Sequence, residues 1–457
     1  MCINGFGGVA VSYRRLEQLI ENLAQENYID NELYKLYNVK RGLRDEHGKG
    51  VLVGLTKISE VHGYLVDEGE KIPDEGKLLY RGINLTDLVR GFQHDNRYGY
   101  EETSYLLLFG KLPNHEELNW YNAYMNDRRV LVKGFIEDYI LKNPSINIMN
   151  ALQRSVLTLY VFDENPDEVT LGNVLIQSLD LIAKAPTLMA YAYQSKKHCY
   201  DKENLHIYAP KSEYSTAENI LYMIRENGTF SKKEAEILDL SLVLHADHGG
   251  GNNSSFTNYV ISSSGTDTYS ATAAAIGSLK GPKHGGANQK VLEMMEFIAD
   301  EIGDNPSDEE IKNILRRIIK KEAFDKSGLI YGMGHAVYTS SDPRATLFKE
   351  KAYELAEEKG VIEAYELFSR IEELSKEIFK EVKGPNFVIC ANVDFYSGLV
   401  YTMLDIPQEL FTPLFAVARM AGWCAHRLEQ IVSDNKIVRP AYKGIKGRIK
   451  YTDMKER

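Results

Sequence analysis

Apolar residues recur at three- and four-residue spacing along most of the chain, which predicts a mainly α-helical protein. The clearest series are Leu16, Leu19, Ile20 and Leu23; Ile311, Ile314, Leu315, Ile318 and Ile319; and Ile371, Leu374 and Ile378. Strand patterns are rare, and only the stretch from Leu52–Leu55 to Val61 indicates a small hairpin. No segment repeats with a period of about 20–50 residues, which excludes a solenoid or propeller.

Two helices have recognisable ends or interruptions. Ser231 and Glu234 have the spacing of a capping box and precede a helical run of apolar residues that leads toward His245. Residues 171–193 form a long apolar helical stretch with Pro186 inside it. Proline lacks the backbone N–H and its ring clashes with the preceding turn, so a kink or a break is expected there.

Glycine clusters interrupt the helical pattern at 249–251, 281–286 and 332–334. Charged, amphipathic stretches follow the second cluster, and the chain turns apolar again from about residue 398. A small domain inserted late in a large one is the natural interpretation, with a ligand site in the cleft between them.

The expected boundaries follow from this pattern. Residues 1–285 form the first part of a large helical domain, and residues 286–395 form a smaller helical domain. Residues 396–457 return to the large domain and end in a tail.

Composition narrows the class of protein. The 457 residues are 44% hydrophobic and carry a formal net charge of −11, which argues against a general nucleic-acid or membrane-surface binder. The four cysteines are scattered without a CxxC pair, as is typical of a reducing cytoplasm. The N-terminus does not resemble a signal peptide, and no apolar run approaches the roughly 20 residues of a membrane span. We therefore expect a soluble cytoplasmic protein.

Four groups capable of acid–base chemistry lie at the breaks between predicted helices. They are His248, His284, His335 and Asp394, each close to glycine, asparagine or proline in sequence. Loop positions of this kind usually serve a site rather than a core. A neutral imidazole can polarise a carbonyl without adding a full charge. Apolar neighbours of Asp394 would raise its basicity, although this residue could equally cap a helix beginning near Ser397.

Three arginines suggest what these groups act on. Arg344 follows Asp-Pro at a predicted helix start, Arg419 lies within an apolar helix, and Arg439 precedes Pro440 in the tail. Guanidinium groups bind carboxylates through paired hydrogen bonds, so the set indicates a pocket for a small polycarboxylate. Taken alone, Arg419 could form a structural salt bridge, and the other two could be solvated surface residues.

Two other interpretations concern the segment around His248. His245, Asp247, His248 and the distant His284 could ligate a metal, but no further acidic or cysteine ligands lie nearby. The following GGGN run could suggest a phosphate loop, yet it lacks the Walker spacing and the final lysine. We expect no metal site.

These segments resemble the citrate synthase family. The resemblance runs through LHADHGGGNNSSFT, GPKHGGANQ, GMGHAVYTSSDPRA, NVDFYSG, the Arg-Pro pair at 439–440 and LLYRGINLTDL from Leu78 to Leu88. It covers most of the chain from about residue 50, and the order and spacing of several independent motifs make it specific. It implies a large and a small helical domain and a homodimer with shared active sites.

The resemblance implies a role for each matching residue. Asp394 would remove a proton from acetyl-CoA, His284 would stabilise the resulting enol, and His335 would polarise and protonate the ketone of oxaloacetate. His248, Arg344 and Arg419 would hold oxaloacetate, and Arg439 would reach the neighbouring subunit's site. The products would be citrate and CoA, as in the tricarboxylic acid cycle, with CoA as cosubstrate and no permanently bound cofactor.

Some features leave alternatives open. Gly249 stands where many family members have glutamate, and Ala336 stands where many bacterial members have arginine, which puts one CoA phosphate contact in doubt. Lys280 and Lys283 could meet CoA phosphates or be solvated. A 2-methylcitrate synthase using propionyl-CoA is the nearest alternative, since one methylene is worth only about 1–3 kcal/mol. A non-catalytic sensor of CoA or citrate is a further one.

Overall fold

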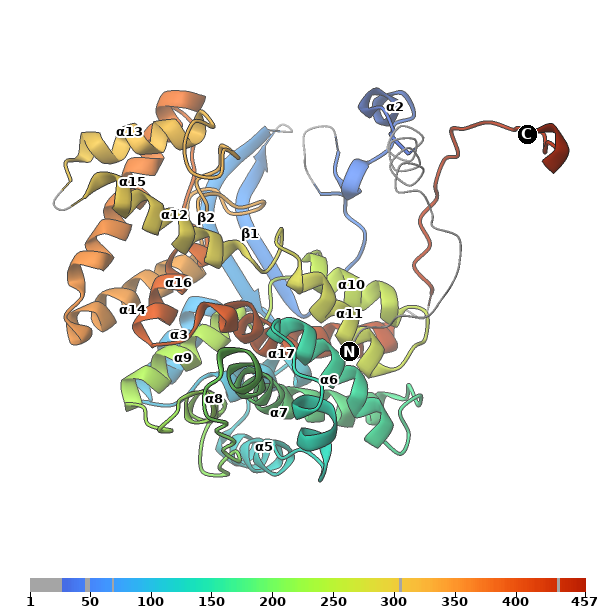
Figure 1. Cartoon of the computed structure of the whole chain (residues 1–457), viewed down its shortest axis with the longest axis vertical. Helices are drawn as coiled ribbons and strands as arrows, with labels where there is room; N and C mark the ends of the chain where they lie inside the picture. The colour runs from blue at the N-terminus through green and yellow to red at the C-terminus, as the bar shows by residue number, and fades with distance from the viewer. Residues whose placement is uncertain (1–26, 46–49, 68–69, 304–305, 434–435) are drawn as a thin grey trace, which may run out of the picture. The chain divides into compact units, whose positions relative to one another are not determined.

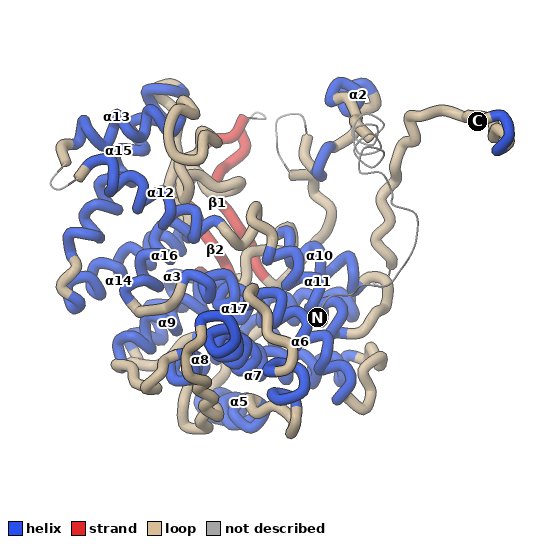
Figure 2. The backbone as a smooth tube through the Cα atoms, in the orientation of Figure 1, coloured by secondary structure: helices blue, strands red, loops and turns tan. Residues whose placement is uncertain are grey.

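The computed structural model describes residues 27–45, 50–67, 70–303, 306–433 and 436–457. Helices make up most of this described part, and its strands form one antiparallel sheet in the order β1-β2-β3 (Figures 1 and 2). The prediction of a mainly α-helical protein is confirmed. The helix predicted at Leu16–Leu23 lies outside the described residues. The described residues up to Leu55 and those from Thr56 onward form two compact units.

In its described residues, 27–45 and 50–55, the first unit has two short helical segments. These are α2 (Asn31–Leu36) and the 3₁₀ segment η1 (Arg41–Leu43).

The second unit begins with β1 (Ser59–Asp67), β2 (Glu70–Tyr80) and β3 (Ile83–Asn84). Its α-helices are α3 (Leu85–His94), α4 (Tyr100–Phe109), α5 (His115–Arg128), α6 (Ile148–Leu159), α7 (Leu171–Lys196), α8 (Thr216–Ile224), α9 (Lys232–His245), α10 (Asn253–Ser262), α11 (Thr268–Lys280), α12 (Ala287–Ile302), α13 (Asp308–Ile319), α14 (Pro343–Lys359), α15 (Ile362–Lys383), α16 (Val393–Met403) and α17 (Phe411–Ser433). Short π-helical segments are η2 (Ile136–Leu141) and η4 (Lys197–Asp201), and 3₁₀ segments are η3 (Tyr160–Phe162), η5 (Gln408–Leu410) and η6 (Met454–Glu456).

The hairpin lies later in the chain than expected. Leu52 and Leu55 belong to no strand and are almost fully exposed. Pairing begins at Ser59, which faces Tyr80, and Val61 faces Leu78. The apolar residues of the earlier stretch have no partner strand, and partner pairing is what stabilises a strand. The register shifts between His62 and Tyr64, so β1 carries an irregularity at Gly63.

The capping box at the start of α9 is confirmed. Ser231 Oγ accepts a hydrogen bond from the Glu234 backbone N–H at 3.1 Å, and Glu234 Oε2 accepts one from the Ser231 N–H at 2.8 Å. The helix ends at His245, as predicted, and the following turn carries His248. The local sequence thus places His248 in the segment that follows a helix end.

Of the kink or break predicted at Pro186, a break is wrong, because α7 continues through this residue to Lys196. Pro186 and its neighbours Ala185 and Thr187 are buried. Packing on several sides of the helix outweighs the hydrogen bond that proline cannot make. Helix propensity alone misjudged this segment because burial was not visible in it.

Helix α17 lies among α4, α7, α9, α10 and α11, and nearly all of its residues from Phe411 to Leu428 are buried (Figure 1). Earlier in the chain, α13 packs on α12 and α15, and α14 packs on α15 and α16. In the ranges that the structure describes, no helix is long and apolar enough to cross a bilayer.

Candidate active site

The structure brings His248 and His335 together, although 87 positions separate them in the chain. Their ring centroids lie 5.0 Å apart in an edge-to-face arrangement. The ring of Tyr338 completes the cluster, 4.7 Å from His335 and 5.6 Å from His248. Burial and the nearby Arg344 hold the pKa of His248 well below its usual value and lower that of His335 to about 4. Both imidazoles are therefore neutral near pH 7.

The loop that carries His335 defines which ring nitrogen holds the proton. His335 Nδ1 accepts hydrogen bonds from the backbone N–H groups of Val337, at 3.1 Å, and Tyr338, at 3.2 Å. A neutral imidazole has one donor and one acceptor nitrogen, so its proton lies on Nε2. Gly332 and Gly334, which lead into this loop, adopt positive φ values of 78° and 89° that favour glycine. The backbone thus presents His335 as a hydrogen-bond donor.

Arg344 is buried and fixed by its neighbour Asp342. Its Nε and NH2 donate to the two carboxylate oxygens of Asp342 at 3.0 and 2.7 Å. The same carboxylate caps the start of α14 and accepts the Val393 N–H at 3.2 Å. Asp342 therefore ties Arg344 to the first residue of α16.

Asp394 lies in the first turn of α16 rather than at its cap. The helix begins at Val393, and Asn392 is the N-cap residue whose side chain accepts the Asp394 N–H at 3.0 Å. The alternative that Asp394 caps a helix near Ser397 is wrong, because Asn392 supplies that oxygen. Burial raises the pKa of Asp394 to about 6, against the opposing effect of Arg344. A carboxylate with this pKa is ionised at pH 7 and more basic than usual.

Arg419 lies on α17 and is fully buried. Its Nε donates to the backbone oxygen of His245 at 2.7 Å, whereas NH1 and NH2 have no hydrogen-bond partner among the described residues. Burial lowers the pKa of Arg419 to about 10, so the guanidinium stays charged at pH 7. A buried cation with two free donor groups is costly unless an anion joins it. The structural salt bridge considered above receives no support in the described part of the chain.

His284 is held by two residues that sequence reasoning missed. Its Nε2 lies 3.1 Å from Ser254 Oγ, and Trp423 Nε1 donates to the same hydroxyl at 3.1 Å. Burial lowers the pKa of His284 to about 4. Ser254 lies in the quoted NNSSFT segment and Trp423 in the apolar stretch, but nothing in either pattern pairs them.

Phe415 on α17 joins these groups. Its ring lies 6.2 Å from that of His284 and 4.5 Å from that of His245, and the Arg419 guanidinium lies 4.7 Å from its centre. The charges of Arg344 and Arg419 both act on Asp394. Six of the seven predicted residues therefore gather at one site.

The seventh, Arg439, is not brought to this site. It is exposed on a tail that follows α17, and Val438 is tied to Ser263 by a backbone N–H donated to Oγ at 3.0 Å. Lys280 and Lys283 are exposed as well, as a solvated role requires.

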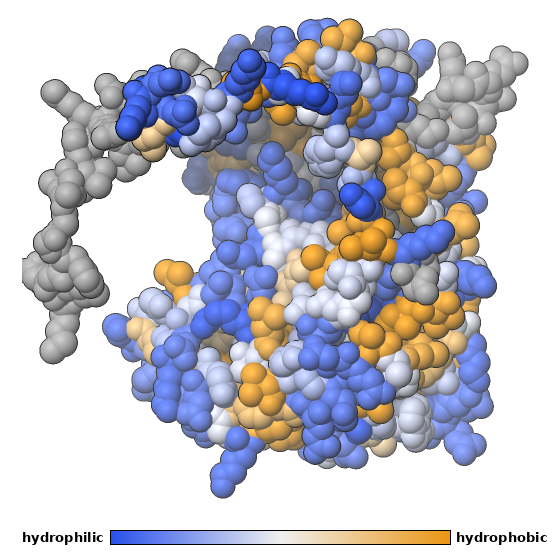
Figure 3. Space-filling model, turned by 90° about the vertical axis from the view of Figure 1, so that its right-hand side faces the viewer, coloured by the Kyte–Doolittle hydropathy of each residue, from blue (hydrophilic) through white to orange (hydrophobic). Residues whose placement is uncertain are grey.

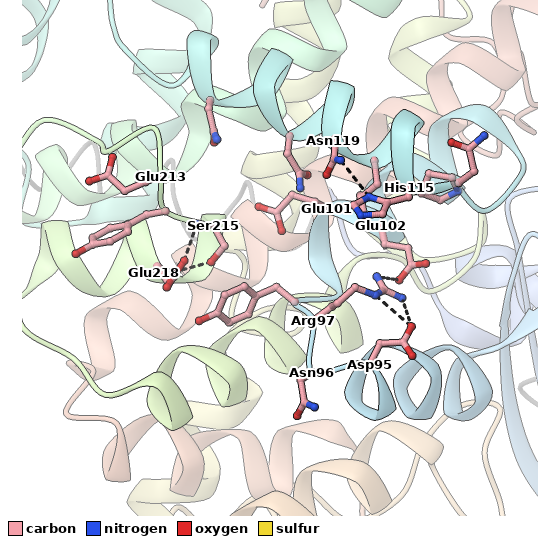
Figure 4. Close-up of a pocket in the computed structure, with 17 residues that line it drawn as sticks. Asp95, Asn96, Arg97, Glu101, Glu102, His115, Asn119, Glu213, Ser215 and Glu218 are labelled. Carbon is pink, nitrogen blue, oxygen red and sulfur yellow. Dashed lines mark hydrogen bonds and ion pairs between the residues drawn. The ribbon is translucent and has the colours of Figure 1, made fainter.

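A cavity of about 700 Å³ lies elsewhere, between α4, α5 and the start of α8. Figure 4 shows Arg97 between Asp95 and Glu102, with Glu218 joined to Ser215. None of the seven predicted residues lines this cavity.

Metal ligation is not supported by the contacts of Asp247. Its Oδ2 accepts hydrogen bonds from the Ser59 hydroxyl and from the Gly249 N–H, the latter at 3.0 Å. Within the described ranges, no group of three or more His, Cys, Asp or Glu side chains could hold a metal ion.

The family model, two relatives by sequence and a solved structure that this chain resembles all belong to the citrate synthases or 2-methylcitrate synthases. Residues 43–441 match the family described as "Citrate synthase, C-terminal domain". A citrate synthase of Haloferax volcanii is 36% identical over 92% of this chain and 97% of its own. A 2-methylcitrate synthase 1 of Corynebacterium glutamicum is 32% identical over 90% of this chain and 96% of its own. The crystal structure of citrate synthase from Pyrobaculum aerophilum has a TM-score of 0.73, with 32% identity, and covers 91% of this chain and 95% of that one.

Proposed function

The chain belongs to the citrate synthase family of acyltransferases, and from this premise we propose that it condenses acetyl-CoA with oxaloacetate and water to give citrate and CoA. One observation carries the proposal: two free donor groups of the buried Arg419 lie in a site with three histidines and a raised-pKa aspartate. This combination suits a small dianion that must react with a carbon acid.

Oxaloacetate is the proposed occupant of the pocket between His248, Arg344 and Arg419. Both terminal nitrogens of Arg419 and Nε2 of His248 are buried without a partner, which supports their role as donors to a carboxylate. Arg344 is already paired with Asp342, so it would act chiefly through its fixed charge and its remaining N–H groups. Nε2 of His335 would donate to the ketone oxygen.

The proposed chemistry begins with proton transfer. Asp394 removes a proton from the acetyl methyl group, and His284 donates a hydrogen bond to the thioester oxygen as negative charge develops there. The resulting carbon nucleophile attacks the ketone carbon of oxaloacetate. His335 gives its Nε2 proton to the ketone oxygen as citryl-CoA forms, and the proton held by Asp394 returns the imidazole to its neutral form. Water then adds its hydroxyl to the acyl carbon and its remaining proton to the CoA sulfur, which releases citrate and CoA.

The direct test is CoA release with oxaloacetate, with acetyl-CoA and propionyl-CoA compared as acyl donors under identical conditions. We expect acetyl-CoA to give the higher kcat/KM. A preference for propionyl-CoA would replace the proposal with 2-methylcitrate synthesis, for which the Corynebacterium glutamicum relative is the supporting observation. Absence of release with either donor, from folded protein that binds oxaloacetate, would favour the sensor alternative.

We also propose a homodimer as the functional unit. Exposed apolar side chains on α6, η3 and α7 support an interface there, since clusters of such residues commonly mark contact surfaces. They are Leu157, Val161, Phe162, Leu171 and Ile176. Figure 3 shows hydrophobic residues among polar ones on the face that carries α10 and α11 in Figure 1. The exposed Arg439 would enter the neighbouring subunit's site.

The remaining proposals concern architecture and location. The mutual packing of α12 to α15 supports a small domain at 286–395, between large-domain segments at 1–285 and 396–457. CoA serves as cosubstrate without a permanently bound cofactor. The free Cys199, Cys390 and Cys424 support a reducing compartment such as the cytoplasm.

A further inference from the structure

One face of α17 makes successive hydrogen bonds to the three residues that precede His248 in the chain. Arg419 Nε donates to the backbone oxygen of His245 at 2.7 Å, and the Gly422 N–H donates to that of Ala246 at 3.1 Å. The next contact joins side chains, since His426 Nε2 lies 3.3 Å from Asp247 Oδ2. Positions 419, 422 and 426 are three and four apart, so they lie on the same helix face.

Asp247, at the end of this row of contacts, is a buried carboxylate next to the substrate site. It is adjacent in sequence to His248 and orients the turn by accepting the Gly249 N–H. Its charge also acts on Arg419. A buried carboxylate this close to a cation with two free donors competes with any substrate carboxylate for that cation.

His426 supplies the opposing charge on the other side of Asp247. The imidazole is 4% exposed, and both ring nitrogens face carboxylates. Nε2 faces Asp247, and Nδ1 lies 3.9 Å from Glu429 Oε2, one turn further along α17. Two facing carboxylates favour a ring that donates from both nitrogens, which is the imidazolium. Asp247 and Glu429 accordingly raise the pKa of His426 to about 9, against the effect of burial.

We propose that His426 is a positioning residue, which holds Asp247 and thereby leaves both terminal nitrogens of Arg419 free to bind a substrate carboxylate. This role rests on the proposed function, because it assigns that carboxylate to oxaloacetate. His426 itself touches no reacting atom. It acts through the Asp247 side chain and the turn that carries His248 and Gly249.

The test is the KM for oxaloacetate in His426→Gln, measured with saturating acetyl-CoA. Glutamine cannot carry the positive charge of His426. Asp247 is then expected to pair with Arg419, which competes with the substrate carboxylate and raises KM. The expected rise is about tenfold or more, the size of one lost charge-assisted hydrogen bond. The kcat value should fall by less than KM rises. His94→Gln is the matched control, because it removes an exposed His–Asp contact of the same 3.3 Å length.

The double variant Asp247→Asn/His426→Gln separates positioning from simple structural damage. It removes both charges of the pair, so Arg419 is free again, and KM should return to within about threefold of the wild-type value. Equal KM in the double and single variants would overturn the proposal, as would an unchanged KM in His426→Gln. If the single variant fails to fold, the double variant decides alone, since it leaves no lone buried Asp247 charge.

Calorimetric binding of oxaloacetate to the same variants keeps this inference distinct from the proposed function. A wild-type protein that binds the dicarboxylate but releases no CoA would defeat the condensation reaction. The His426 proposal would then stand or fall on the dissociation constants, which should follow the same order as the KM values.

Discussion

The carboxylate of Asp342 accepts two hydrogen bonds from the guanidinium of Arg344, one from Nε at 3.0 Å and one from NH2 at 2.7 Å. Because Asp342 also accepts the Val393 N–H, this pair sets the position of α16 and of Asp394 in its first turn. A buried pair of this kind fixes geometry more than it adds stability. The opposite charges of Asp342 and Arg344 also shift the pKa of Asp394 in opposite directions.

Replacing Asp342 with asparagine should make Asp394 a weaker base. The negative charge of Asp342 raises the pKa of Asp394, whereas Arg344 lowers it. Asp342→Asn removes the first effect and leaves Arg344 unbalanced, so the pKa falls. The acid limb of kcat/KM against pH should therefore move to lower pH than in the wild type. A limb that stays in place or moves to higher pH would contradict this assignment.

In the wild-type protein, that acid limb should lie near pH 6. Asp394 must be ionised to accept a proton, and its pKa is about 6. Below this pH, kcat/KM should fall about tenfold per unit, and above about pH 7 it should be level. His284 and His335, with pKa values of about 4, stay neutral throughout and add no limb in this range.

Removing the base itself should separate binding from chemistry. Asp394→Asn keeps the size of the side chain but cannot accept the proton, so kcat should fall by about 10²–10⁴-fold. Oxaloacetate affinity, measured by calorimetry, should change little because the binding groups remain. Turnover close to the wild-type rate would remove Asp394 from the role of base.

The Ser254 hydroxyl should matter for the acyl half of the reaction. Ser254→Ala leaves the Trp423 indole N–H and His284 Nε2 without their shared partner, so His284 loses its fixed orientation. We expect kcat to fall about tenfold, with the KM for oxaloacetate little changed. Ser264→Ala is the matched control, since that exposed hydroxyl donates to the Ile261 backbone oxygen, away from the candidate site. Equal kcat values in both variants would show that the contact between Ser254 and His284 does not contribute to catalysis.

Arg419 should not tolerate lysine. Arg419→Lys keeps the charge but loses both the Nε bond to His245 and the paired donors. The KM for oxaloacetate should rise about tenfold or more, because one carboxylate loses a bidentate contact. A KM within twofold of the wild-type value would show that oxaloacetate binding requires only a positive charge at position 419, and not the paired donors of arginine.

Gly422 is required by close packing. A Cβ there would overlap Ala246 O and Asp247 Oδ1, so Gly422→Ala must push α17 from the turn. We expect a loss of about 1–3 kcal/mol in the free energy of unfolding, measured with urea. Gly91→Ala in α3, where a Cβ meets nothing, should instead raise stability by about 0.5–1 kcal/mol. Similar stability in the two variants would refute the steric argument.

Local sequence marked the breaks in the helical pattern near which the histidines and Asp394 lie, namely the segment after α9, the turn between α11 and α12, the loop before α14 and the start of α16. The capping box at Ser231 and the helix end at His245 are examples, since their bonds span only a few residues. Contacts between residues far apart in the chain could not be predicted from the sequence pattern. Ser254 and Trp423 are 169 residues apart, and no local pattern pairs them.

The errors have the same physical origin. The break expected at Pro186 ignored burial on several sides of α7, which tertiary packing alone supplies. The hairpin was expected too early because its ends are set by the partner strand, and Leu52 finds none. The Asp394 cap was misassigned by two residues, within the usual uncertainty of helix boundaries.

The irregularity at Gly63 has a mechanical consequence. At one end of β1, Ser59 is bonded to Asp247, in the turn that α17 holds. Beyond it, the Gly63 oxygen accepts the Thr339 hydroxyl of the His335 loop. β1 therefore connects two halves of the site, one with His248 and Arg419 and one with His335 and Arg344. The register shift beside Gly63 lies on this connection, so the spacing of the two halves depends on the local twist of β1.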